Sequence, residues 1–416
     1  MLTIGLGGLI ILLVAVVSFV VIIIIGVPWI SDDQVVAEPA ELVVDAVEET
    51  PGVSDTHVVF GQSAALSGPA RDLGLNMRRG IEAAFFEANS NGGVHGRQFA
   101  LISRDDAYEP GIAITNTSDL IEEQQVFALI GAVGTPTSRS AVPIAAEAGV
   151  PYIAPFTGAD FLRDTSRLNT VINLRASYNQ EAEEMVERLT KDRGVTRIAL
   201  LYQDDSFGRA GFRGVTAALD RRGMRLVSTG VYPRNTTAVK TALLDIWEGR
   251  PEAVILIGAY EPIATMVSWA KRLELESVFM TLSFVGGIEL AQELGPYGSG
   301  VYVTQVVPSP KDDAIPVVSA YLSAMSIYDP NATPDFVSLE GYLAGRLAIA
   351  GVHSCGKDVD RDCFFEGIRG SSSIDIDGFE LIYGADDNQG SDAIFLSVIG
   401  SDGQYHSVDS LKDPVP

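Results

Sequence analysis

Short apolar runs alternate with longer amphipathic stretches along most of the chain. The short runs are typical of strands buried in a parallel sheet, and apolar residues spaced three or four apart are typical of helices. The pattern predicts strands over residues 57–66, 98–102, 126–130, 150–154, 171–175, 197–202, 225–231, 253–257, 278–282, 301–304, 379–383 and 393–398. It predicts helices around Met77 and over residues 111–124, 179–193, 209–222, 237–247, 263–272, 315–328 and 339–352. This alternation indicates an α/β fold with mostly parallel sheets and right-handed crossovers.

The alternation runs through two similar series that join near Arg175. A chain of 416 residues is long enough to bury more than one core. We therefore expect two Rossmann-like lobes with a cleft between them. Ligand pockets favour such lobe interfaces, so the cleft is the first place to look for a binding site.

The N-terminal stretch breaks this alternation. From Ile4 to Val27 the chain is almost unbroken in apolar residues, enough to cross the roughly 30 Å hydrocarbon core of a membrane as a helix. No Lys or Arg precedes it, and it is too long for the apolar region of a cleaved signal peptide. We therefore expect residues 1–30 to form a retained membrane anchor. An atypical signal peptide or a misassigned start codon is the alternative.

Residues 31–55 are acidic and contain no Lys or Arg. Such a self-repelling, weakly apolar stretch is typical of an extended tether. A solvated helix over residues 41–49 is the alternative, and it would serve the same purpose. With an anchor at one end of the tether, the folded part of the chain must be exported.

Charge and composition exclude several classes of function. Acidic residues outnumber basic ones 54 to 29, for a formal charge of −25, which disfavours binding to nucleic acid. The four histidines stand apart, and the chain has no Gly-x-Ser-x-Gly elbow, phosphate loop or His-Glu-x-x-His pattern. We expect neither an enzyme nor a bound cofactor. Asp105 and Asp106 could hold a metal, but without further ligands nearby we expect a capping or surface role.

Cys355 and Cys363 are the only cysteines of the chain, and they lie close together in sequence. In an exported protein this arrangement favours a local disulfide. Two free thiols, or half of a metal site, are the alternatives.

The clearest candidate for a binding site runs from Leu129 to Gly158. It reads as a strand, a glycine-rich turn, a short helix that Pro136 would start, and a second strand with its exit loop. Backbone N–H groups and hydroxyls at a helix N-terminus can bind a carboxylate. Both loops would lie at the carboxyl edge of one sheet, where α/β folds bind ligands. Two ordinary turns between strand and helix are the alternative.

Several short motifs of the folded part follow one another in a recognisable order. They are Leu66-Ser67-Gly68-Pro69, Asn91-Gly92-Gly93 with Gly96-Arg97, Asp105-Asp106, Ile130-Gly131, Ala154-Pro155 and Asp205 to Gly208. In this order and spacing the chain resembles the leucine/isoleucine/valine-binding family of periplasmic solute receptors, the type I binding proteins that serve ABC importers. The resemblance covers roughly His57 to Ser407.

The resemblance implies the type I fold of two lobes joined by a hinge. Lobe 1 would comprise residues 56–175 plus 305–372, and lobe 2 residues 176–304 plus 373–408. The chain would then cross between the lobes near Arg175, Thr304 and Ser373. Crossings of this kind let two lobes close on a ligand.

The resemblance also assigns candidate ligand-binding residues. Thr135 and the loop Phe156-Thr157-Gly158 would hold the carboxylate of a ligand through hydroxyl and backbone N–H groups. Phe207 and Tyr260 would supply rings from the second lobe. Ser67 would lie on the rim of the first lobe.

Two positions depart from the amino-acid binders of the family. Ser283 stands where those binders have an acid that pairs with the ligand ammonium, and Leu73 stands where they often have a tyrosine. A buried ammonium without an anionic partner is costly. Either Glu261 or Asp204 supplies the missing charge, or the ligand has no ammonium.

We therefore expect an extracytoplasmic receptor that delivers a small polar ligand to an ABC permease in the cytoplasmic membrane. The ligand would be a branched-chain or other amino acid, or a related small carboxylate or amide. The alternative is a sensory ectodomain that signals through a partner protein, because the fold is shared by sensors. A sensor needs an output domain or a second membrane helix, and we find neither pattern in the sequence.

Overall fold

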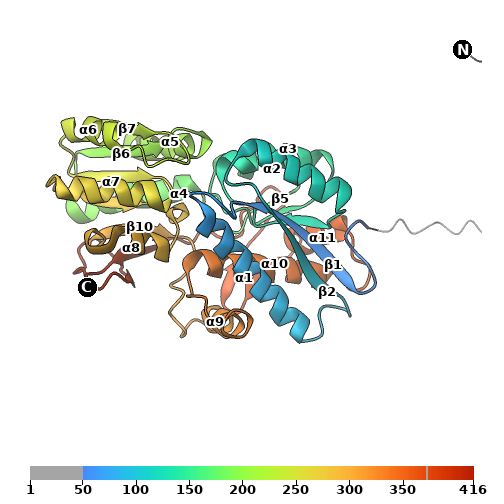
Figure 1. Ribbon diagram of the computed structural model, residues 1–416. Helices are drawn as coiled ribbons and strands as arrows, with labels where there is room; N and C mark the ends of the chain where they lie inside the picture. Colours follow the sequence, from blue (N-terminus) through green and yellow to red (C-terminus); the bar gives the residue numbers. More distant parts are fainter. Residues whose placement is uncertain (1–49, 372) are drawn as a thin grey trace, which may run out of the picture. The chain divides into compact units, whose positions relative to one another are not determined.

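The computed structural model describes residues 50–371 and 373–416 (Figure 1). The expected anchor over residues 1–30 and most of the expected tether lie outside this range, and both stay predictions. No helix in the described part of the chain is long and apolar enough to cross a membrane. The last residues of the expected tether join the folded part, because Val53 pairs with Val58 and the Val59 N–H donates to the Gly52 carbonyl at 2.8 Å.

The first sheet has five strands in the order β2-β1-β3-β4-β5, and every neighbouring pair is parallel. The strands are β1 (His57–Ala64), β2 (Gln98–Asp105), β3 (Ala128–Ile130), β4 (Tyr152–Ile153) and β5 (Val171–Ile172). The helices that follow the first three strands are α1 (Arg71–Ser90), α2 (Pro110–Ser118) and α3 (Thr135–Glu147). Three later helices belong to the same part of the fold, namely α9 (Pro316–Tyr328), α10 (Phe336–Ser354) and α11 (Arg361–Arg369).

The second sheet has seven strands in the order β14-β13-β10-β9-β8-β6-β7. Its strands are β6 (Ile198–Gln203), β7 (Ser228–Tyr232), β8 (Ala253–Ile257), β9 (Val278–Thr281), β10 (Val301–Gln305), β13 (Phe395–Ile399) and β14 (Tyr405–Ser407). The helices of this lobe are α4 (Tyr178–Arg193), α5 (Ser206–Asp220), α6 (Lys240–Glu248), α7 (Tyr260–Arg272) and α8 (Ile288–Leu294). Strands β6 to β10 are parallel, and β13 and β14 add to the edge in antiparallel pairs.

The order of the strands makes the chain pass between the two sheets three times. It leaves the first sheet after β5, returns after β10 to form α9 to α11, and leaves again before β13. A small hairpin of β11 (Ile374–Ile376) and β12 (Phe379–Leu381) precedes the last passage. Two lobes of α/β structure are thereby confirmed, while the exact lobe boundaries and the hinge role of the crossings stay predictions.

Local sequence explains several element boundaries. The all-apolar run of β8 is buried along its whole length, as a central parallel strand requires. Helix α4 begins with a capping box of Ser177 and Gln180, and α5 begins where the Asp205 carboxylate accepts the N–H groups of Phe207 and Gly208. The helix expected over residues 111–124 is shorter, because α2 ends at Ser118 and a π-helical turn over Asp119–Glu123 follows.

Glycines allow α1 and α10 to lie side by side in close contact (Figure 1). A Cβ atom on Gly80 would lie 2.0 Å from the Ser338 carbonyl oxygen, and one on Gly341 would lie 2.3 Å from the Met77 carbonyl oxygen. Backbone therefore meets backbone at this crossing, and a larger residue would force the helices apart.

We expect Gly341→Ala to lower the free energy of unfolding by about 2–3 kcal/mol, because the added methyl group has no room beside the Met77 carbonyl. Gly111→Ala is the matched control, since a Cβ there would meet nothing within 4 Å. Urea denaturation of both variants checks this. Equal stability of Gly341→Ala and Gly111→Ala would show that the crossing relaxes freely.

Candidate ligand-binding site between the lobes

Two threonine hydroxyls meet at the carboxyl edge of the first sheet. Thr135 is the first residue of α3, Thr157 lies in the loop after β4, and both are fully buried. Their Oγ1 atoms lie 2.7 Å apart and share a hydrogen bond. The two loops are joined by backbone hydrogen bonds, from the Phe156 N–H to the Ala132 carbonyl and from the Gly134 N–H to the Phe156 carbonyl. The structure thus brings together the two residues that the sequence pointed to.

Tyr178 brings a third hydroxyl to this edge. Its ring packs against the loop at Gly158, where a Cβ atom would lie 2.7 Å from a ring carbon of the tyrosine. Burial raises the pKa of Tyr178 to about 12, so the phenol keeps its proton. The Thr157 hydroxyl lies near the phenol oxygen and opposes this rise in pKa, but the phenol makes no hydrogen bond of ordinary geometry with any described residue. This hydroxyl is a donor that is free to bind an acceptor such as a ligand oxygen.

Three phenylalanine rings pack together beside the ring of Tyr178. Phe156 precedes Thr157 in the first lobe, while Phe207 and Phe284 belong to the second lobe. The Phe284 ring centre lies 4.5 Å from that of Phe207 and 5.4 Å from that of Phe156. Phe207 in turn lies 5.4 Å from the ring of Tyr178. The site is therefore apolar, with a small number of hydroxyls, which is the usual composition of a ligand pocket.

A buried network of charges lies behind Phe156. The Arg175 guanidinium lies 4.6 Å from the centre of the Phe156 ring and 3.5 Å from the Glu340 carboxylate. Arg175 also donates to the Ser283 hydroxyl. Ser283 donates from its N–H and its hydroxyl to Glu181, at 2.8 and 2.9 Å, and Thr304 donates to Glu181 at 2.7 Å. Arg175, Glu181 and Glu340 are each at most 2% exposed.

Burial governs the ionisation of these acids. It raises the pKa of Glu340 to about 7 and also raises the pKa of Glu181, while the positive charge of Arg175 opposes both shifts. The positive charge of one guanidinium therefore stabilises the ionised form of two buried carboxylates. The hydrogen bonds from Ser283 and Thr304 further stabilise the charged form of Glu181.

The structure changes the interpretation of Ser283. The sequence argument looked to Glu261 or Asp204 for a missing negative charge, but the acid that Ser283 contacts is Glu181. Asp204 is exposed and pairs with Arg209 at 2.9 Å, and Glu261 is partly exposed at the start of α7. Glu181 and Glu340 were missed because no local pattern marks either of them as part of a site: Glu181 lies in the first turn of α4, where acids are common, and Glu340 lies in α10. Their one signal was a carboxylate on the apolar face of a predicted helix.

Other candidate residues lie at the edge of the site. Tyr260 donates its hydroxyl to Asp72 of the first lobe at 2.8 Å, so it joins the lobes. Ser67 is exposed, and its N–H donates to the Asp105 carboxylate at 3.1 Å. Leu73 is fully buried on α1. Asp105 is exposed and also accepts the N–H groups of Leu66 and Ala107, so it stabilises a loop and caps no helix. Asp106 is fully buried and accepts from the Ser63 hydroxyl at 2.8 Å, so the expected capping or surface role does not describe it.

The two lobes also meet around a small hollow near the site. Residues of the first lobe and of the second lobe line it together. They are Pro69, Ala70, Tyr108, Gln203, Asn235, Thr236, Ala259 and Pro262. Beside it, Arg234 of the second lobe pairs with Glu109 of the first lobe at 2.6 Å.

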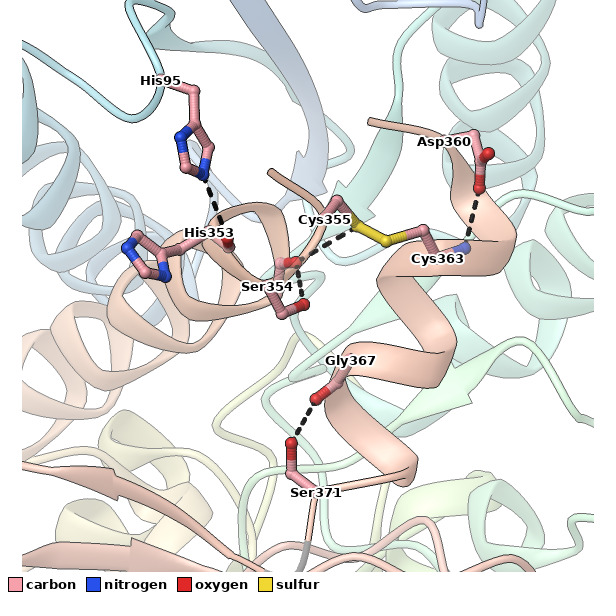
Figure 2. The surroundings of a disulfide bond; sticks show 9 residues. His95, His353, Ser354, Cys355, Asp360, Cys363, Gly367 and Ser371 are labelled. Carbon is pink, nitrogen blue, oxygen red and sulfur yellow. Dashed lines mark hydrogen bonds between the residues drawn. A yellow bond between two sulfur atoms is a disulfide. The ribbon is translucent and has the colours of Figure 1, made fainter. Parts of the chain in front are cut away.

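The two cysteines form a disulfide in the first lobe. Cys355 is the C-cap that follows α10, and Cys363 lies in the first turn of α11, where its N–H donates to the Asp360 carboxylate at 2.7 Å (Figure 2). His95 and His353 stack nearby with ring centres 5.3 Å apart. Within residues 50–371 and 373–416, no group of three or more His, Cys, Asp or Glu side chains could hold a metal ion. The disulfide connects two helices and takes no part in the site.

Comparison with known proteins identifies the family to which this architecture belongs. A family described as periplasmic binding protein matches residues 57–404, and the chain belongs to that family. Members of the family are receptors that bind solutes outside the cytoplasm. The crystal structure of a possible leucine/isoleucine/valine-binding protein from Rhodopirellula baltica SH 1 is 37% identical, covers 88% of this chain and 100% of its own, and superposes with a TM-score of 0.82.

Other relatives point to the same type. A substrate-binding periplasmic protein from Ralstonia solanacearum is 26% identical, with 84% of this chain and 100% of that chain covered and a TM-score of 0.80. The Leu/Ile/Val-binding protein homolog 7 of Brucella abortus is 28% identical over 222 residues, which is 51% of this chain and 55% of that protein. The match thus spans about half the length of this curated relative. The chain therefore belongs to the leucine/isoleucine/valine-binding family of type I periplasmic binding proteins.

An acid pair at the lobe interface makes stability depend on pH. Asn76 of α1 donates to Glu289 of the second lobe at 2.8 Å and to Asp335, the N-cap of α10, at 3.2 Å. Burial and the neighbouring Glu289 raise the pKa of Asp335 to about 7. In the unfolded chain an Asp side chain has a pKa of about 4. The folded chain therefore holds this proton more tightly, and the resulting stabilisation is lost as the pH rises from about 4 to 7.

We expect Asp335→Asn to remove this loss, because the amide does not ionise. Relative to the unsubstituted chain, the variant should gain about 1–3 kcal/mol of unfolding free energy between pH 4 and 8. Denaturant titrations across that range measure it, with the exposed Asp386→Asn as control. Parallel stability profiles for Asp335→Asn and the unsubstituted chain would contradict the assignment.

Proposed function

We propose that this chain is the extracytoplasmic receptor of an ABC importer and that it binds a small carboxylate between its lobes. The observation that carries the proposal is the group of three buried hydroxyls on Thr135, Thr157 and Tyr178, one of which lacks a partner among the described residues. A buried polar group without a partner costs about 1–3 kcal/mol. A ligand oxygen that accepts from Tyr178 recovers that cost.

The charge of the surroundings favours a single negative charge on the ligand. The hydroxyl donors are neutral, and the nearby guanidinium of Arg175 lies 3.5 Å from the Glu340 carboxylate and donates to the Ser283 hydroxyl, while its Nε and Nη1 atoms have no hydrogen-bond partner among the described residues. A dianion such as phosphate would need further cations, and two buried acids disfavour it. A monocarboxylate is stabilised by hydroxyl and backbone donors alone.

Within the class of small carboxylates, the ligand can either carry the ammonium group of an amino acid or lack it. Ser283 stands where an acid would pair with it, but Glu181 lies directly against Ser283 and Glu340 lies across Arg175. Either carboxylate is a partner for an ammonium within the same buried network. The proposed ligands are therefore branched-chain or other amino acids and related small carboxylates or amides. The relatives are named as binding proteins, so we do not propose the sensory alternative.

The test is a thermal-shift screen of the full chain against amino acids, short carboxylates and amides. A ligand at 100 times its dissociation constant stabilises the native state by about 2.7 kcal/mol. We expect carboxylates to raise the melting temperature and matched primary alcohols to leave it unchanged. Branched-chain amino acids among the hits would assign the ammonium to Glu181 or Glu340. Stabilisation by alcohols and carboxylates alike would overturn the carboxylate site.

We expect Thr157→Val to weaken binding of the best hit by about 1–3 kcal/mol, because the substitution removes a hydroxyl donor and keeps the size of the side chain. Isothermal titration calorimetry measures the change. Thr117→Val, a buried threonine on α2, is the matched control and should bind as the unsubstituted chain does. An unchanged dissociation constant for Thr157→Val would remove this residue from the site.

A further inference from the structure

One side chain of the second lobe reaches into the first. Phe284 lies in the 3₁₀ turn Ser283–Val285 that follows β9, and it is fully buried. Besides Phe207 of its own lobe, its ring packs against Phe156 at 5.4 Å and Tyr108 at 6.1 Å between ring centres. Both of those rings belong to the first lobe. The ring of Phe284 therefore forms an aromatic contact between the lobes.

The position of the Phe284 ring relative to the three hydroxyls determines how much space is left for a ligand. Phe156 is the chain neighbour of Thr157, and Phe207 packs against Tyr178. Phe284 touches both of these rings, so it lies against the ring that adjoins Thr157 in the chain and the ring that packs on Tyr178. The segments that carry Phe156, Tyr178, Phe207 and Phe284 each follow a parallel strand. Such folds bind ligands at the carboxyl ends of these strands. An apolar group attached to a carboxylate at the hydroxyls must share this space with the Phe284 ring.

Interiors are close-packed, so a ring that is removed leaves room that another apolar group can fill. The ring of Phe284 is anchored by its neighbour Ser283, which bonds to both Arg175 and Glu181. These bonds fix the backbone from which the ring projects. The ring is thus held in place by the buried polar network and does not depend on a ligand for its position.

We propose that Phe284 is a specificity-determining residue whose ring limits the size of the apolar group that a ligand can carry. The site then takes carboxylates with short aliphatic groups and excludes those with an aromatic ring. This inference rests on the proposed function, since it concerns the same site.

The experiment compares the unsubstituted chain with Phe284→Ala in calorimetric titrations of two matched pairs, isovalerate with phenylacetate and leucine with phenylalanine. The unsubstituted chain should bind the isobutyl member of a pair more tightly. Phe284→Ala should shift the ratio of dissociation constants toward the phenyl member by roughly tenfold or more, because the vacated volume fits one ring. Phe364→Ala, which removes an equally buried ring packed on Phe127 of the first lobe, should keep the original ratio.

The outcomes separate this inference from the proposed function. If a pair binds and Phe284→Ala leaves its ratio unchanged, Phe284 only packs the lobe interface and the inference is overturned. If the unsubstituted chain binds no member of either pair or any other carboxylate, the proposed ligand class fails and the inference falls with it. If circular dichroism shows that Phe284→Ala does not fold, Phe284→Leu takes its place. A smaller shift in the same direction supports the inference, and no shift overturns it.

Discussion

The guanidinium of Arg175 is the interaction on which the rest of the structure depends. It lies where the chain first passes from one sheet to the other, and it contacts Glu340 of the first lobe and Ser283 of the second. A buried charge is tolerated only when it is paired and hydrogen-bonded. Removing one partner of such a pair typically costs about 3–5 kcal/mol, because the other charge stays buried. Arg175 therefore connects the two lobes at the crossing.

The contacts of this charged network position the residues of the candidate site. Arg175 packs on Phe156, which adjoins Thr157, while Ser283 positions the neighbouring Phe284. Polar contacts at the edge of the interface, such as Tyr260 with Asp72 and Asn76 with Glu289, join the lobes a second time. The buried charges thus orient the loops that carry the site. The side chains proposed to face a ligand are hydroxyls and aromatic rings. A neutral but hydrogen-bonding surface of this kind suits a small anion.

Much of the fold could be predicted from the sequence because it follows from local pattern. The buried run of β8 and the capping residues of α4 and α5 are local signals, and so were the glycines that bring Thr135 and Thr157 to one edge. The charged network could not be predicted in the same way. Glu181 and Glu340 lie in helices far apart in sequence, and only the tertiary fold places them around Arg175. Phe284 was missed for the same reason, since nothing near it marks a ring that crosses between lobes.

The most direct measurement is a crystal structure of the chain with a carboxylate identified by its stabilising effect. The account predicts that the carboxylate oxygens lie within hydrogen-bonding distance of the hydroxyls of Thr135, Thr157 and Tyr178, with the apolar part of the ligand against Phe284. A ligand bound instead in the hollow near Tyr108 and Gln203, with the two threonine hydroxyls still bonded only to each other, would contradict it.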